Sequence, residues 1–513
     1  TLGGGELYIY VLLEHKSAPD PEVGVQLLGY LAEIWRRLDR QRLEQGGAVG
    51  SERPPIVPLV IYHGAREWTV PLSFGETVAA NPALRRYLPD FTYSLLDLGQ
   101  VADDQLSDQR VARGGLRVLK YSHRPDGQGA AVLAAVDDLL DVSRLQAGVL
   151  GVSVRPTDVD DVILGNANGA GEENRNVARM AWLLAGFPDT VPGITVNRLC
   201  ASGMSAIGIA TAMVRSGMAD VVVAGGVESM SRAPWVMEKP TTAFAKPGAA
   251  FDTAIGWRFV NPRFADGEFG EKFTFSMPET AEEVGEVDGI TREDADAFAA
   301  RSHERALAAI EAGRFADEIV PVVVKGRKGA ETIVDTDEGP RPGSTPEVLA
   351  GLRPIIKKDG VVTAGNSSSL NDGASAILVV SERAAQKYGL TPRARVVEST
   401  SAGLAPEIMG LGPVPATEKA LERSGWSVAD LGAVELNEAF ATQSLASMRR
   451  LGLDPETVNA DGGAIALGHP LGSSGSRLVV TLLGRMEREG ADRGLATMCV
   501  GVGQGSAMLV ERV

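Results

Sequence analysis

The stretch GGAIALGHPLGSSG, residues 462–475, sets one histidine, His469, among five glycines and leads into a helix-forming segment at about 474–488. Glycines let a ligand approach the backbone closely. The proline after the histidine, with Ser473 and Ser474, is expected to cap the helix and fix the loop. A lone histidine is often structural, so this loop by itself leaves a structural and a catalytic interpretation open.

Outward from this loop, a tripeptide repeat indicates an internal duplication. The sequence TVN at 457–459 precedes the His469 loop and its helix. The same tripeptide at 195–197 ends a short strand and precedes NRLCASGMSA, which contains Cys200 and opens a small-residue helix at 202–215. Glycine-punctuated strand and helix units of this kind predict an α/β protein with two similar halves.

Each of the two cysteines lies in a strand-end loop. The N-terminus of the helix after Cys200 is expected to lower the pKa of that thiol toward a reactive thiolate. Cys499, in ATMCVGVGQG, precedes Gly501, whose backbone N–H can be aimed at an oxyanion. The alternative for both cysteines is a small buried residue, because free cysteines are often buried.

Asn437 and Glu438 follow an apolar strand at 434–436, the usual place for site residues in α/β folds, although a turn with an Asx cap is the alternative. Together, these loops hold both cysteines and one of the two histidines after residue 143. A cysteine nucleophile, a histidine base and a second acid/base are what thioester exchange with a carbon nucleophile requires. The other late histidine, His303, is expected on the exposed face of a polar helix.

Size and composition exclude several classes of protein. The 513 residues, 44% of them hydrophobic, suffice for about three domains. The net charge of −16 argues against non-specific binding to nucleic acid or an anionic membrane. The two cysteines form no CxxC pair, and no apolar run has the length of a membrane span or the flanks of a leader. A reducing cytoplasm is therefore the expected location.

Six motifs resemble, in order, the signatures of the thiolase family over about 158–513: NRLCASGMSA, VVVAGGVESMSRAPW, TAGNSSSLNDGAS, VELNEAFA, GGAIALGHPLGSSGSR and CVGVGQGSAML. The resemblance implies an α/β protein with a duplicated, layered αβαβα fold. It implies an N-terminal half at 143–391, with an inserted loop domain at about 230–365, and a C-terminal half at 392–513. The implied activity is acyl-CoA:acetyl-CoA C-acyltransferase, by a ping-pong cysteine mechanism.

The same resemblance assigns a role to each candidate residue. It makes Cys200 the nucleophile, His469 its base and a ligand of the thioester oxygen, and Cys499 the acid/base for the α-carbon. One oxyanion hole contains a water positioned by Asn437, and the N–H groups of Cys200 and Gly501 form the second. The implied CoA contacts are Ser368 for pantetheine and, along the CoA tunnel, Met277, Arg341, Met409 and Phe440.

Two segments, DTAIGWRFVNP at 252–262 and SMPETAEEV at 276–284, look most similar to thiolases that act on 3-oxoadipyl-CoA in aromatic catabolism. The wider 3-ketoacyl-CoA group of fatty acid β-oxidation is the alternative. The resemblance implies no permanently bound cofactor, CoA and acetyl-CoA as substrates, acyl-CoA thioesters as binding partners, and a homodimer or homotetramer without membrane attachment.

The chain also departs from the family. Ser369 stands where glycine is expected beside Ser368. Before DDVILGNANGAG at 160–171, the family has a strand and a complete helix; here the strand is absent and a partial helix at about 143–154 remains. That strand is expected to be central in the first half's sheet, so its loss predicts exposed edges and lost core burial.

Residues 1–142 are similar to a different family, the recombination-promoting nucleases (transposase-type) of the PD-(D/E)XK class. The segments that carry the similarity are ELYIYVLLEHKSAPD, QLLGYLAEIWRRL, PPIVPLVIYHGAREW and YLPDFTYSLLDLG. Glu14 and Lys16 match the E-x-K half of the motif on one strand face, where that family binds Mg²⁺. The family's metal-binding aspartate lies upstream, before residue 1. The similarity therefore implies a truncated α/β segment that binds neither metal nor nucleic acid.

Three hypotheses follow from these resemblances. The first is a thiolase. The second is a metal-dependent DNA nuclease with a passenger domain. The third is a catalytically impaired fusion of two truncated parts.

Overall fold

The computed structural model describes residues 10–16, 18–44, 56–62, 67–78, 91–98, 154–244, 246–264, 271–326 and 330–513. The chain divides into two compact units, Thr1–Ser153 and Val154–Val513. The partial helix expected at about 143–154 lies, up to residue 153, outside the described residues.

The first unit contains a three-stranded parallel sheet in the order β1-β2-β3, with a helix between the first two strands. The helix buries Val23, Leu27 and Leu31, which recur every fourth residue and so form one apolar face. The bounds of the elements are β1 (Tyr10–Lys16), α1 (Val23–Glu44), β2 (Ile56–Tyr62), α2 (Phe74–Thr77) and β3 (Ser94–Asp97).

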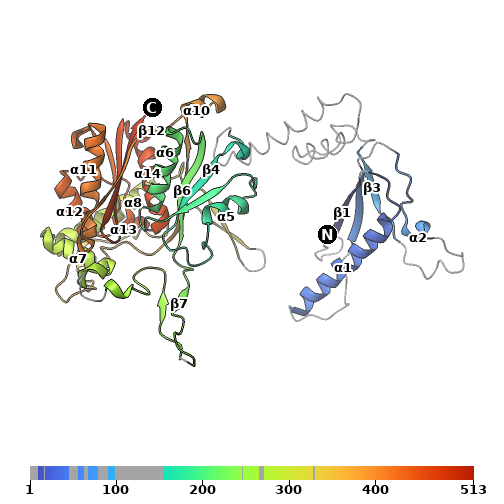
Figure 1. Cartoon of the computed structure of the whole chain (residues 1–513), viewed down its shortest axis with the longest axis horizontal. Coiled ribbons are helices and arrows are strands. Elements are labelled where there is room, and N and C mark those ends of the chain that lie inside the picture. The colour runs from blue at the N-terminus through green and yellow to red at the C-terminus, as the bar shows by residue number, and fades with distance from the viewer. Residues whose placement is uncertain are drawn as a thin grey trace. The chain divides into compact units, whose positions relative to one another are not determined.

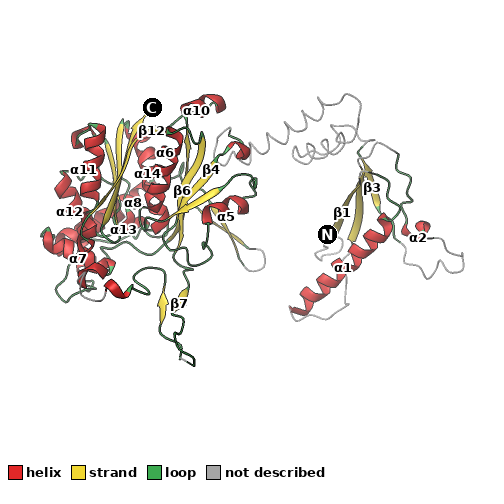
Figure 2. Ribbon diagram, in the orientation of Figure 1, coloured by secondary structure: helices red, strands yellow, loops and turns green. Residues whose placement is uncertain are grey.

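The second unit has five layers (Figure 1). Two sheets, each with four strands among the described residues, enclose a central layer formed by α6 (Ser202–Arg215) and α14 (Leu471–Glu489). The outer layers are α5 (Val177–Leu184) on one side and α11 (Pro413–Ser424) with α12 (Ala441–Leu451) on the other. Helices and strands alternate across the unit (Figure 2). This is the αβαβα arrangement expected from the sequence.

The two sheets have corresponding orders. The first is β11-β6-β4-β5 and the second is β12-β15-β14-β13, and β11, β6 and β4 correspond to β15, β14 and β13. In both sheets an antiparallel pair, β11/β6 or β15/β14, is followed by a parallel pair, β6/β4 or β14/β13. Val458 of the second TVN extends the second sheet by a bridge to Val434, as the first TVN does within β5. The strands are β4 (Asp161–Gly165), β5 (Gly193–Val196), β6 (Val221–Ser229), β11 (Asp372–Val380), β12 (Ala394–Gly403), β13 (Ala433–Leu436), β14 (Arg493–Val500) and β15 (Gln504–Arg512).

The expectation that the first sheet lacks a central strand is wrong. In the first sheet β4 and β6 pair directly, with no gap between them. β12 of the second sheet has no counterpart among the described residues of the first sheet. β12 lies at the edge of its sheet, beside β15. The difference therefore affects the outer edge of β11 and leaves the middle of the sheet intact.

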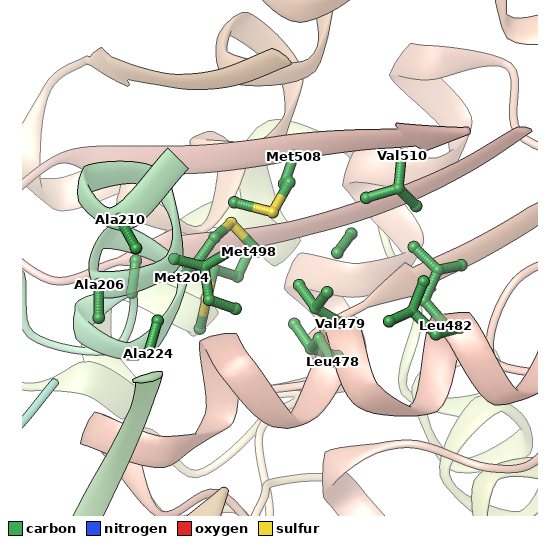
Figure 3. Packing of buried hydrophobic residues seen from close by; sticks show 14 of the residues in the cluster. Met204, Ala206, Ala210, Ala224, Leu478, Val479, Leu482, Met498, Met508 and Val510 are labelled. Atoms are coloured by element: carbon green, nitrogen blue, oxygen red, sulfur yellow. The ribbon is translucent and has the colours of Figure 1, made fainter. Parts of the chain in front are cut away.

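The core of the second unit lies around the central helices. Figure 3 shows Met204 of α6 facing Met498 and Met508 of the second sheet, with Leu478 of α14 below them. Small residues let the two helices approach closely: a Cβ on Gly203 would lie 2.5 Å from Ser476 Oγ, and one on Gly475 would lie 2.5 Å from Met204 N. This contact joins the two halves without an intervening side chain.

A longer insertion separates β6 from β11. Its central helix, α8 (Arg292–Glu311), begins after Thr291, whose hydroxyl accepts a hydrogen bond from the N–H of Asp294. Gly313 follows with φ +68°. The other elements are β7 (Trp235–Met237), β8 (Ala250–Asp252), α7 (Met277–Val287), β9 (Val322–Lys325), β10 (Glu331–Val334) and α9 (Pro346–Ala350), and α10 (Glu382–Tyr388) and α13 (Ala464–Leu467) complete the unit.

Candidate active site

Cys200 lies in a tight turn between β5 and α6. The residue before it, Leu199, has φ +47°, a left-handed conformation that is unfavourable for leucine. Two side chains hold this turn: Asn197 Oδ1 accepts from the N–H of Leu199 at 2.8 Å, and the Ser202 hydroxyl donates to the carbonyl of Leu199 at 2.7 Å. The turn thereby fixes the thiol at the first turn of the central helix.

The resting thiol of Cys200 is protonated. Burial raises its pKa to about 11, outweighing the hydrogen bonds from the backbone N–H groups of Gly501 and of Cys200 itself; the Glu228 carboxylate raises it further. The expectation that the helix N-terminus produces a reactive thiolate is wrong, because a buried thiolate loses more solvation than these N–H groups restore. Cys200 therefore needs a base at the moment of reaction.

Cys499 ends up beside Cys200 because of the β14–β15 hairpin. Cys499 is fully buried near the end of β14, and Gly501 begins the turn, in which Val502 has φ +60°. Burial and the neighbouring Cys200 thiol raise the pKa of Cys499 well above its usual range. Gly501 meets the turn of the nucleophile candidate from the second half: a Cβ on it would lie 3.0 Å from the side chain of Leu199, and its N–H lowers the pKa of the Cys200 thiol.

The imidazole of His469 is held in one tautomer. The Ser474 hydroxyl donates to the carbonyl of Pro470 at 2.9 Å, so it accepts from His469 Nδ1–H at 2.6 Å. Nε2 then carries the lone pair and accepts from Asn437 Nδ2 at 3.3 Å. Burial lowers the pKa of His469 to about 3, and the Arg477 cation lowers it further, so the ring is neutral at pH 7.

Two side chains from the first half hold the His469 loop. Asn371 Oδ1 accepts from the N–H of His469 at 3.2 Å and from the hydroxyl of Ser369, the residue that replaces the expected glycine. The buried carboxylate of Glu228, at the end of β6, accepts from the N–H of Gly472 at 2.8 Å. The expected caps Ser473 and Ser474 lie inside α14, which has no side-chain cap of its own. Glu228 takes over that role from the other half of the unit.

Glu228 also fixes the loop after β4. Its two oxygens accept from the N–H groups of Ala167 at 2.8 Å and Asn168 at 3.1 Å. One buried carboxylate therefore joins three segments: the end of β6, the loop after β4 and the start of α14, which follows His469. The sequence signal that could have revealed it is a charged residue at the end of the otherwise apolar β6, a place where site residues collect.

Three of the five expected CoA contacts gather around Cys499. Met409 and Phe440 share one apolar cluster with its sulfur, and Met277, at the start of α7, packs against this cluster. Ser368 lies beside it, because its N–H donates to the carbonyl of Ala439 at 3.0 Å. Arg341 lies apart from this cluster, on an exposed loop before α9.

The expectation that His303 lies on the surface is wrong. His303 is buried, and its Nδ1 accepts from the backbone N–H of Arg341 at 3.2 Å. Burial lowers the pKa of His303, and the Arg341 cation lowers it further. The polar composition of α8 suggested a solvent-facing helix, but the loop that contains Arg341 covers this side of it.

Asn437 Oδ1 is buried with no hydrogen-bond partner among the described residues. An amide oxygen in such a place is a site for a bound water or a substrate hydrogen. The buried loops thus hold a protonated thiol beside a second thiol, and a neutral imidazole whose Nε2 accepts from the Asn437 amide. This set can transfer an acyl group to sulfur and move a proton at carbon.

The nuclease-like motif of the first unit stays a prediction. Glu14 and Lys16 lie two residues apart in β1, paired with Val60 and Tyr62 of β2, and their side chains lie outside the described residues.

In the described part of the chain, no cluster of three His, Cys, Asp or Glu side chains is placed to hold a metal ion. Within the same residues, no helix combines the length and apolar character needed to cross a membrane.

Two protein families match the chain, and their matches overlap at residues 126–146. Residues 126–383 match the family model "Thiolase, N-terminal domain", and residues 390–512 match "Thiolase, C-terminal domain". The first match begins upstream of residue 158, where the recognisable motifs begin. Residues 1–146 match "Putative transposase, YhgA-like".

The relatives include the beta-ketoadipyl-CoA thiolase of Pseudomonas knackmussii, 54% identical over 76% of this chain and 97% of that protein. The 3-oxoadipyl-CoA/3-oxo-5,6-dehydrosuberyl-CoA thiolase of Escherichia coli K12 is 52% identical with the same coverage. Among solved structures, the acetyl-CoA acetyltransferase of Bacillus anthracis is 44% identical with a TM-score of 0.66. Human mitochondrial 3-ketoacyl-CoA thiolase in complex with CoA is 38% identical, with a TM-score of 0.66. Each structural match covers 73% of this chain and 92% of the other.

Proposed function

This chain belongs to the thiolase family, and we propose that it exchanges acyl groups between CoA thioesters as an acyl-CoA:acetyl-CoA C-acyltransferase. The observation that carries the proposal is the close approach of Gly501 to the Cys200 turn: a Cβ on Gly501 would lie 3.0 Å from the side chain of Leu199, and the Gly501 N–H lowers the pKa of the Cys200 thiol. This approach joins the candidate nucleophile of one half to the loop that follows Cys499 in the other.

In the acylation step, His469 Nε2 takes the Cys200 proton as the sulfur attacks the 3-keto carbon of the substrate. With a pKa of about 11 for the thiol and about 3 for the imidazolium, a preformed ion pair is unfavourable. Proton transfer is therefore coupled to attack, and the charge passes to the substrate oxygen. The protonated Nε2, a water held by Asn437 and the N–H groups of Cys200 and Gly501 serve as oxyanion donors, each removal costing about 3–4 kcal/mol.

In the carbon step, the bond between the 2- and 3-carbons breaks, the acyl group stays on the Cys200 sulfur, and the acetyl-CoA carbanion takes a proton from Cys499. The raised pKa of Cys499 keeps that proton available. CoA then attacks the thioester, its thiol proton passes to Cys499, and the Cys200 sulfur leaves and takes back the proton held by His469 as the shortened acyl-CoA is released. Condensation runs through the same steps in reverse, with Cys499 removing the α-proton of acetyl-CoA.

We propose 3-oxoadipyl-CoA as the substrate, with other 3-ketoacyl-CoA thioesters as the wider class. The support is the 52–54% identity to relatives named for that substrate. The apolar cluster of Met277, Met409 and Phe440 at Cys499 supports a pantetheine path along this side, with Ser368 beside it and Arg341 outside for the phosphates of CoA.

We also propose assembly as a homodimer or homotetramer, in the cytoplasm. β5 ends the first sheet in the described part of the chain and exposes Ile194, and edge strands of this kind pair with a second copy. The β7–β8 hairpin exposes Trp235, Met237 and Phe251 and projects from the unit (Figure 1). Two buried free thiols suit a reducing compartment.

The test is CoA-dependent loss of 3-oxoadipyl-CoA and of acetoacetyl-CoA by the purified full chain. We expect turnover of both, with iodoacetamide labelling of Cys200 slowed by acetyl-CoA. A folded protein that consumes neither thioester, and in which acetyl-CoA does not protect Cys200, refutes the proposed function and supports an inactive fusion. Mg²⁺-dependent nicking of plasmid DNA, abolished by Glu14→Ala, would instead support the nuclease alternative.

A further inference from the structure

The acyl group of the proposed substrate carries a second carboxylate at its far end. Entering a site as closed as the one around Cys200, that anion needs a cationic partner, because burying an unpaired charge is costly. A thioester of the same length without the carboxylate has no such need. This inference rests on the proposed function and asks which residue supplies the cation.

Arg258 is a candidate because of the loop it holds. Its Nη2 donates to Asn168 Oδ1 at 2.7 Å, and the N–H of Asn168 donates to the Glu228 carboxylate. The preceding residue, Ala167, accepts at its carbonyl from Asn197 Nδ2 at 2.7 Å, and Asn197 belongs to the turn that holds Cys200. The guanidinium is thus anchored to the same loop that supports the nucleophile.

The other side of the same segment borders the second sulfur. Trp257 Nε1 donates to the carbonyl of Phe275 at 3.3 Å. Phe275 lies two residues before Met277, which packs on the cluster that contains Cys499. The segment that contains Arg258 therefore runs from the Cys200 side of the site to the Cys499 side.

The charge of Arg258 is available for a ligand. Among the described residues no carboxylate forms an ion pair with it, and the side chain is half-buried. A guanidinium has five N–H donors in a planar fork that fits a carboxylate. Asn168 accepts from one nitrogen, so donors remain for a second acceptor.

We propose that Arg258 binds the distal carboxylate of the acyl group and thereby selects dicarboxylic 3-oxoacyl thioesters. Arg258 lies in DTAIGWRFVNP, a segment that no step of the acyl transfer uses. Its neighbours face apolar contacts and backbone groups, so the guanidinium is the feature of this segment that recognises an anion. Arg198, two residues before Cys200 and also half-buried, is the competing cation.

The experiment compares kcat/KM for 3-oxoadipyl-CoA with that for 3-oxohexanoyl-CoA, which has the same length and no distal carboxylate. In Arg258→Met we expect the ratio of the two values to fall by about tenfold to 100-fold, the range for a lost hydrogen bond to a charged group. Arg258→Lys, which keeps the charge and loses the fork, is expected to fall in between. Arg232→Met is the matched control, because Arg232 is exposed and paired with Glu172.

Each outcome decides the proposal. An equal loss on both thioesters in Arg258→Met means that Arg258 only ties its segment to Asn168, and an unchanged ratio means that it does not meet the substrate. A fall of the ratio in Arg198→Met and none in Arg258→Met transfers the role to Arg198. All three results refute the proposal. If wild-type protein cleaves neither thioester, the proposed function has failed and the ratio is undefined.

Discussion

The two halves of the second unit have the same arrangement but unequal cover. In the second half, β15 is buried from Gly505 to Val510, with β12 at its edge and α11 on its outer face. In the first half, the corresponding strand β11 exposes Ala374 and Ala376 in the described structure. The comparison shows that one half of a duplicated fold can lack an edge strand in the described structure while the paired central helices stay buried.

The candidate site residues are also divided unevenly between the two halves. The first half contributes Cys200, and the second contributes Asn437, His469, Cys499 and Gly501. The first half compensates by holding the second half's loop through Asn371 and Glu228. The candidate site therefore depends on both halves. The first half supplies the candidate nucleophile and also holds the loop of the candidate base in place.

The largest expected effect separates the two cysteines. Cys200→Ala removes the acyl carrier, so both thiolysis and acetyl exchange between CoA thioesters should fall by about 10⁴-fold or more. Cys499→Ala should lose thiolysis to a similar extent, yet still form the acetyl-enzyme from acetyl-CoA. Radiolabelled acetyl exchange and intact-protein mass spectrometry measure the difference. Loss of the acetyl-enzyme in both variants would contradict this division of roles.

The next effect concerns the tautomer of His469. Ser474→Ala removes the acceptor of Nδ1–H, so the proton can move to Nε2 and block the base. We expect kcat to fall about tenfold to 100-fold, a part of the 10²–10⁴-fold that a general base contributes. Steady-state kinetics measure this, with Ser473→Ala, which does not contact the ring, as the neighbouring control. Equal kcat values for the two variants would argue against the tautomer role.

Glu228→Gln tests the contact between the halves. The amide cannot accept all three backbone N–H groups, so we expect a loss of about 1–3 kcal/mol in unfolding free energy. The carboxylate raises the pKa of Cys200, so its neutralisation lowers that pKa. The pH profile of iodoacetamide labelling should therefore shift toward lower pH while kcat falls. An unshifted profile would mean that Glu228 has only a structural role.

The smallest effect is expected in β11, in comparison with its counterpart β15 in the second sheet. Ala507→Lys in β15 places a charge in a fully buried position and should cost several kcal/mol of stability. Ala376→Lys in β11 should stay within about 0.5 kcal/mol, because Ala376 is exposed. Thermal unfolding monitored by circular dichroism compares the two. A similar cost for both substitutions would mean that β11 is covered as well as β15 is.

Periodicity and motif spacing predict the elements of the second unit well. α6 spans the expected residues, and both TVN tripeptides lie at the expected sheet positions, because local patterns set these features. The neutral state of Cys200, the burial of His303 and the helix cap from Glu228 depend on packing between distant segments. No local pattern carries that information, although the charged residue at the end of β6 marks a position to examine.

The glycine contact between α6 and α14 limits how this enzyme can change. A single methyl group at position 203 or 475 has no free space and would separate the halves on which the reacting sulfurs sit. Evolution or engineering toward bulkier acyl chains must therefore remodel the insertion between β6 and β11 and leave the helix pair alone. The range of acyl groups accepted and the positions of the reacting residues are therefore set by different parts of the chain.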